Sequence, residues 1–149
     1  MTERPEESLI HGTWILEEMS TEFAGKAPVK HAGAEGTLMY DKDLKTVFAR
    51  ISRPDEKQAS GKLLFEYAGH YSFDPEQNNV IYHNLEWATN PKMLERPKMK
   101  REFNLVAPEF YTFTVGVCVP SAPVRLDIIG ASAEYPDAKI VIRWKKLEQ

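Results

Sequence analysis

The segment that decides the fold is residues 65–117, FEYAGHYSFDPEQNNVIYHNLEWATNPKMLERPKMKREFNLVAPEFYTFTVGV. Four stretches within it have the composition and alternation of strands: residues 65–74, 80–89, 99–106 and 110–117. The links between them are short and rich in turn residues, with no interval that has the length and pattern of a helix. The segment therefore predicts a meander of antiparallel strands.

Aromatic and hydrogen-bonding side chains share these four strands. They are Tyr67, His70, Tyr71, Tyr82, His83, Trp87, Arg101, Phe103, Tyr111 and Phe113. A sheet that carries both kinds of side chain can line a cavity with apolar walls and a few polar groups. We therefore expect the functional centre of the protein on this meander.

The rest of the chain supplies the other elements. Further strand patterns are found at residues 9–21, 36–40, 46–52 and 139–146. A short helix is predicted across residues 56–64, with Asp55 or Ser60 as its cap, although Gly61 weakens it. Residues 124–129 could add a strand inside a stretch with several prolines, which is the hardest part of the chain to predict.

The strand count predicts an all-β fold. Eight strands in an open sheet would leave two exposed edges, and closing the sheet removes both. A barrel of eight strands is just wide enough to hold side chains or one small ligand. We therefore predict a single domain, residues 1–149, folded as an eight-stranded antiparallel up-and-down β-barrel, with residues 1–8 as a flexible N-terminal segment.

Composition excludes several classes of function. The chain of 149 residues has 42% hydrophobic residues, 28% charged residues and a net charge of −3, which is typical of one globular domain and argues against a nucleic-acid partner. The single cysteine, Cys118, favours a reducing compartment, and no stretch has the pattern of a signal or membrane span. We therefore expect a cytoplasmic protein. Scattered histidines and the lack of a glycine-rich phosphate loop predict no metal and no nucleotide cofactor.

Several short motifs occur in an order that is found in one known family. They are Gly12-Thr13-Trp14, Gly36-Thr37-Leu38-Met39-Tyr40, Arg53-Pro54-Asp55, Tyr67-Ala68-Gly69-His70-Tyr71, His83 before Pro91, Arg101 with Phe103 and Leu105, and Ile142-Arg143-Trp144. With them the chain resembles the lipocalin-like domain family, small intracellular relatives of the lipocalins among the calycin barrels. The resemblance implies an up-and-down barrel with a ligand cavity at one end. Members include binding proteins and proteins encoded beside natural-product enzymes, and residues 119–137 depart from the family's shorter final connection.

His83 is the first candidate for a functional residue. It matches a histidine typical of the family, and a neutral imidazole can exchange a proton near neutral pH. The alternative, a structural histidine that is simply hydrogen-bonded to a neighbour, is slightly favoured over a catalytic one. If His83 points inward, strand periodicity places Trp87 on the same inward face. The loop at residues 75–79 would place Tyr71 across from His83, whereas a shift of one residue would place His70 there.

Two arginines are the next candidates. Arg101 shares a face with Phe103, so it is expected either to bind an anion or a carbonyl in the barrel or to reach water at the mouth. Arg50 could also point into the barrel. The opposite face of its strand carries small apolar side chains, however, and is the simpler face to bury. The predicted ligand-binding set is Tyr71, His83, Trp87, Arg101, Phe103, Tyr111 and Arg50. Trp14 is expected to fill the closed end, with Arg143 over its ring.

These residues support two main hypotheses. The first is a barrel that binds a small hydrophobic or aromatic molecule with a carbonyl or carboxylate group. The second is a cofactor-free isomerase or cyclase of polyketide- or terpenoid-type biosynthesis, with His83 as acid or base and with Arg101 and Tyr71 stabilising an enolate. A third interpretation is a partner-binding module that forms a homodimer through residues 119–137.

Overall fold

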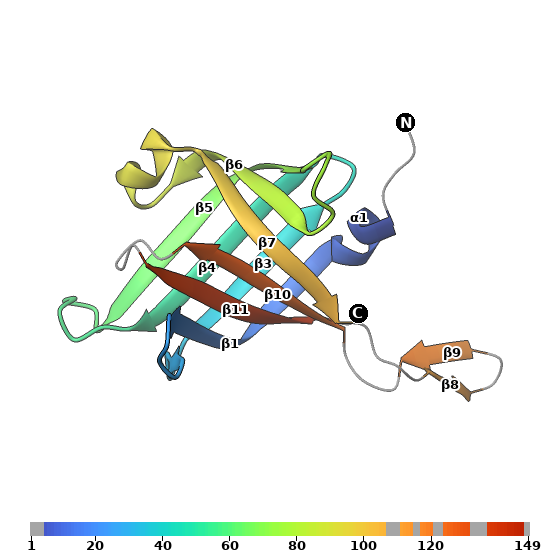
Figure 1. Cartoon of the computed structure of the whole chain (residues 1–149), viewed down its shortest axis with the longest axis horizontal. Coiled ribbons are helices and arrows are strands. Elements are labelled where there is room, and N and C mark those ends of the chain that lie inside the picture. The colour runs from blue at the N-terminus through green and yellow to red at the C-terminus, as the bar shows by residue number, and fades with distance from the viewer. Residues whose placement is uncertain (1–4, 107–110, 115–116, 121–123, 132–136, 148–149) are drawn as a thin grey trace.

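Strands make up most of the computed structural model, which describes residues 5–106, 111–114, 117–120, 124–131 and 137–147 (Figure 1). The elements are α1 (Pro5–Ile10), β1 (Gly12–Phe23), β2 (Val29–Lys30), β3 (Glu35–Asp41), β4 (Thr46–Pro54), β5 (Lys62–Phe73), β6 (Val80–Ala88), the 3₁₀ turn η1 (Pro91–Glu95), β7 (Lys98–Val106), β8 (Tyr111–Thr114), β9 (Val117–Pro120), β10 (Arg125–Ala131) and β11 (Ala138–Lys146). Among the helices in these ranges, none is long and apolar enough to cross a membrane.

Eight of the strands form one closed barrel. Their order is β1-β3-β4-β5-β6-β7-β10-β11, and β11 pairs back onto β1 from Trp14↔Lys146 to Phe23↔Ala138. Every pairing is antiparallel, and each strand lies beside the next barrel strand in the chain. The short strand β2 only extends the edge of β1. The predicted fold class, an antiparallel eight-stranded up-and-down barrel, is confirmed.

The identity of one barrel strand differs from the prediction. Residues 110–117 were expected to pair with β7, but β8 pairs with β9 in a separate two-stranded sheet. The partner of β7 is β10, in register from Arg125↔Val106 to Ile129↔Glu102. The reason is that residues 111–114 and 125–131 both have strand composition, so composition does not decide between them, and the pairing of residues 125–129 with residues 102–106 of β7 does. The strand left open at residues 124–129 therefore closes the barrel.

The predicted helix at residues 56–64 is wrong. A turn links β4 to β5, in which the backbone N–H of Lys57 donates to the Asp55 carboxylate at 2.9 Å and Gly61 takes a φ of +77°. Asp55 therefore caps a turn, and the left-handed Gly61 starts the return strand. A short α-helix occurs instead at α1 (Pro5–Ile10), which overlaps the end of the predicted flexible segment, residues 1–8.

The end of the barrel next to α1 is densely packed. Trp14 is fully buried, and its indole N–H donates to the backbone oxygen of Ile10 at 2.8 Å. The cation over the Trp14 ring is Lys146, at 4.7 Å from the ring centre, and not Arg143. Arg143 points outward, where its guanidinium donates to both oxygens of Asp127 at 2.8 and 3.0 Å. Trp14 thus fills this end as predicted, but the cation over its ring is Lys146 and not the predicted Arg143.

Candidate functional site

The opposite half of the barrel encloses a cavity of about 320 Å³. Its apolar walls include Met19, Leu38, Ile51, Phe65, Met99, Ile128, Ile140 and Ile142. Its polar lining is formed by Thr21, Arg53, Tyr67, His83, Asn90, Arg101 and Trp144. Asn90 and the lining residue Met93 belong to the η1 turn and its cap between β6 and β7, so the cavity lies at the end of the barrel away from α1. Alternation along each strand produces this lining, because every second side chain points inward.

His83 lies in the wall of the cavity and is 1% exposed. Its Nε2 lies 2.7 Å from the hydroxyl of Tyr40, and its Nδ1 lies 2.8 Å from the hydroxyl of Tyr67. Burial, with a smaller contribution from the charge of Arg101, lowers the pKa of His83 from 6.5 to about 3. Burial also raises the pKa of both tyrosines. At neutral pH the three side chains therefore form an uncharged, hydrogen-bonded group.

The register around His83 agrees with the prediction. Tyr71 is paired directly with His83 across β5 and β6, and it is 4% exposed. His70 points outward and contacts Glu86. The ring of Tyr71 packs edge-on against Tyr40, with 5.3 Å between the ring centres. Tyr71 therefore supports the core below the cavity, while the tyrosine of β5 that lines the cavity is Tyr67.

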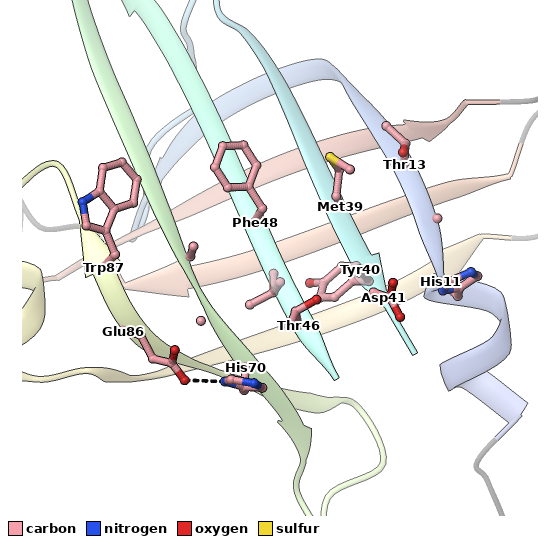
Figure 2. A pocket seen from close by; sticks show the side chains of 14 residues that line it. His11, Thr13, Met39, Tyr40, Asp41, Thr46, Phe48, His70, Glu86 and Trp87 are labelled. Carbon is pink, nitrogen blue, oxygen red and sulfur yellow. Dashed lines mark hydrogen bonds and ion pairs between the residues drawn. The ribbon is translucent and has the colours of Figure 1, made fainter. Parts of the chain in front are cut away.

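The predicted inward position of Trp87 is wrong. In the pairing of β5 with β6, Gly69 lies opposite Leu85 and Ala68 lies opposite Trp87, so Glu86 is an extra residue in a β-bulge. A bulge reverses the alternation of the residues that follow it. Trp87 is consequently 48% exposed on the outer face of the barrel, where it lines a surface pocket together with Phe48 and Met39 (Figure 2).

The two candidate arginines, Arg101 and Arg50, lie in different places. Arg101 lines the cavity and lies flat against Gly130, where an added Cβ would come within 2.7 Å of its Nη1. Its Nη1 donates to the backbone oxygen of Lys100 at 3.0 Å, and no carboxylate of the described residues forms an ion pair with it. Arg50 is exposed outside the barrel, 3.8 Å from Glu66, so it does not belong to the cavity.

Two further predicted residues also lie away from the cavity lining. Phe103 is 7% exposed and packs against Phe73, with 5.8 Å between the ring centres, so it belongs to the core. Tyr111 is part of β8, in the separate two-stranded sheet, and its side chain lies outside the described residues.

Trp144 is a site residue that sequence reasoning did not select. It is 2% exposed and lines the cavity, and its indole N–H has no hydrogen-bond partner among the residues described. Strand alternation places Trp144 on the same face of β11 as Ile140 and Ile142, and this pattern is the sequence signal that could have identified it. Tyr67 could have been found in the same way from Tyr71, because four residues along a strand return to the same face.

No group of three or more metal-ligating side chains occurs in the ranges that the structure covers. The polar side chains on the cavity wall include two arginines, Tyr67 and Trp144, whose N–H and O–H groups are suited to hydrogen bonding with a ligand.

Comparison with known proteins assigns neither a family nor a function to the chain. No family model matches the chain, and no curated protein sequence matches it. The family likeness therefore remains a resemblance of short motifs. Among solved structures, the chain is similar to "Odorant Binding Protein OBP1", with 7% sequence identity, a TM-score of 0.43, and coverage of 100% of this chain and 77% of that chain. This similarity is too low to assign a family or a function.

Proposed function

We propose that this protein binds a small, mainly apolar molecule bearing a carboxylate or carbonyl oxygen inside the barrel cavity. The observation that carries the proposal is Arg101, a guanidinium on the wall of a mainly apolar cavity, which has no carboxylate partner among the described residues. A charged group in such a position is costly unless it is solvated or paired. An anionic or strongly polar ligand oxygen would provide that pairing.

The volume of the cavity limits the size of this ligand. At 320 Å³ it is near the lower end of the range for small-molecule sites, about 300 to 1,000 Å³. It is equivalent to about ten water molecules at the volume that each occupies in the liquid. A molecule with one or two fused rings and a short polar group has suitable dimensions.

The site favours binding over the isomerase or cyclase alternative. A general base works best when its pKa lies near the operating pH, whereas burial lowers the pKa of His83 to about 3. Both nitrogens of its ring are also within hydrogen-bond distance of tyrosine hydroxyls. His83 is thus a weak base whose nitrogens are already engaged, and it suits the positioning of a ligand better than the removal of a proton from carbon.

A titration with 2-naphthoate tests the proposal. The wild-type protein should bind this probe with a change in tryptophan fluorescence, because Trp144 lines the cavity. Arg101→Gln should weaken binding about ten- to a hundredfold, since a hydrogen bond to a charged group contributes about 1.5 to 3 kcal/mol. Arg50→Gln is the matched control, because Arg50 lies outside the barrel, and it should leave the affinity unchanged. Equal losses in both variants, or no binding to the wild type, would contradict the proposal.

A further inference from the structure

The hydrogen bonds of Tyr40, His83 and Tyr67 leave one proton without a partner. A neutral imidazole carries one ring proton and each phenol carries one, so the group has three protons. Only two contacts join them: Tyr40 to Nε2 and Tyr67 to Nδ1. Each contact uses one proton, so one tyrosine hydroxyl must direct its proton elsewhere. Neither hydroxyl has another hydrogen bond within the described part of the chain.

The tautomer of His83 decides which hydroxyl this is. If the proton is on Nδ1, the imidazole donates to Tyr67, Tyr40 donates to Nε2, and the hydroxyl of Tyr67 is left to donate. If the proton is on Nε2, the imidazole donates to Tyr40, Tyr67 donates to Nδ1, and the Tyr67 oxygen can only accept. Tyr67 lines the cavity and Tyr40 does not. The tautomer therefore sets whether the cavity wall donates or accepts at Tyr67.

Among the other side chains of the cavity wall, Trp144 and Arg101 have polar groups that can only donate hydrogen bonds. Trp144 lines the cavity, and its buried indole N–H has no partner among the described residues. Arg101 offers further N–H groups and has no acceptor capacity. A ligand oxygen that accepts hydrogen bonds is the complement of both, and its presence would favour the His83 tautomer in which Tyr67 also donates.

We propose that the cavity recognises a carbonyl oxygen through a donor set formed by Tyr67 and Trp144, with His83 as the positioning residue that turns the Tyr67 hydroxyl toward the ligand. This inference rests on the proposed function and names the chemical class of the ligand: a molecule whose oxygen accepts hydrogen bonds and donates none, as in a ketone, aldehyde or carboxylate. The low basicity of the buried His83 supports it, because the ring stays neutral when the tautomer changes.

Two probes of the same shape provide the test. 2-Acetylnaphthalene carries a ketone oxygen, and 2-ethylnaphthalene does not. Long-range ¹H–¹⁵N spectra of labelled full-length protein should show His83 protonated on Nδ1 in the ketone complex, and the indole N–H signal of Trp144 should move further with the ketone than with the hydrocarbon. A ketone complex with His83 protonated on Nε2 overturns the inference.

The affinities for the two neutral probes provide a second test. Tyr67→Phe should reduce the preference for 2-acetylnaphthalene over 2-ethylnaphthalene by about five- to tenfold, the effect of one lost hydrogen bond. Tyr71→Phe is the matched control, because it removes a buried hydroxyl from the same strand outside the cavity, and it should leave the preference unchanged.

An unchanged preference in Tyr67→Phe, with both probes still bound, overturns the inference but not the proposed function. A failure of 2-naphthoate and both neutral probes to bind overturns the two together.

Discussion

The buried imidazole of His83 should make the stability of the barrel depend on pH. Its pKa falls from 6.5 in the unfolded chain to about 3 in the folded one, chiefly because of burial. Between these values the unfolded chain binds a proton that the folded protein does not. The contribution of His83 is therefore fully present above about pH 6.5 and is lost as the pH falls toward 3, by about 1.4 kcal/mol for each pH unit.

The experiment compares the wild type with His83→Gln. Glutamine cannot titrate, but its amide can still donate to one tyrosine and accept from the other. Urea unfolding followed by tryptophan fluorescence at several pH values down to about 5 gives the free energy of unfolding. Between about pH 6.5 and 5 the wild type should lose about 2 kcal/mol more than the variant.

The exposed His70 on the neighbouring strand provides the control. His70→Gln leaves the buried imidazole in place, so the part of the pH dependence that His83 causes must persist in it. Comparison within this narrow range limits the contribution of carboxylates, which titrate mainly at lower pH. Parallel curves for the wild type and His83→Gln would refute the reasoning, because they would mean that folding does not change the proton affinity of His83.

Three further predictions follow from packing. Gly69→Ala should lower the free energy of unfolding by about 2 to 3 kcal/mol in the same urea assay, because its Cβ would lie 2.0 Å from the backbone oxygen of Asn84 at the bulge. Gly130→Ala would displace only the flexible end of Arg101, so 2-naphthoate affinity should fall about tenfold at nearly constant stability, and retained affinity would argue against Arg101 as the anchor. Trp87→Ser should leave that affinity unchanged in a calorimetric titration, because Trp87 lies outside the barrel; a loss would place it in the site.

The sequence alone determined the barrel and part of the site. Alternation and turn composition located most of the strands, and the need to remove open edges predicted their closure into an eight-stranded barrel, because both depend on local chemistry and on the period of two along a strand. The five-residue loop between β5 and β6 was enough to place Tyr71 opposite His83 and to turn His70 outward. The shared face of Arg101 and Phe103 indicated that Arg101 lies either in the barrel or at its mouth, and the structure places it on the cavity wall.

Other features depended on the tertiary structure, because the two-residue period of a strand does not predict them. A single extra residue at Glu86 turned Trp87 out of the barrel, because a bulge leaves no strong signal in the sequence and reverses every side chain after it. The contact between Tyr40 and His83 joins residues 43 positions apart, and it forms only when the curved sheet brings β3 and β6 across the same interior. The choice of β10 as the partner of β7 likewise depended on two segments of similar composition, and the tertiary pairing with residues 102–106 decided between them.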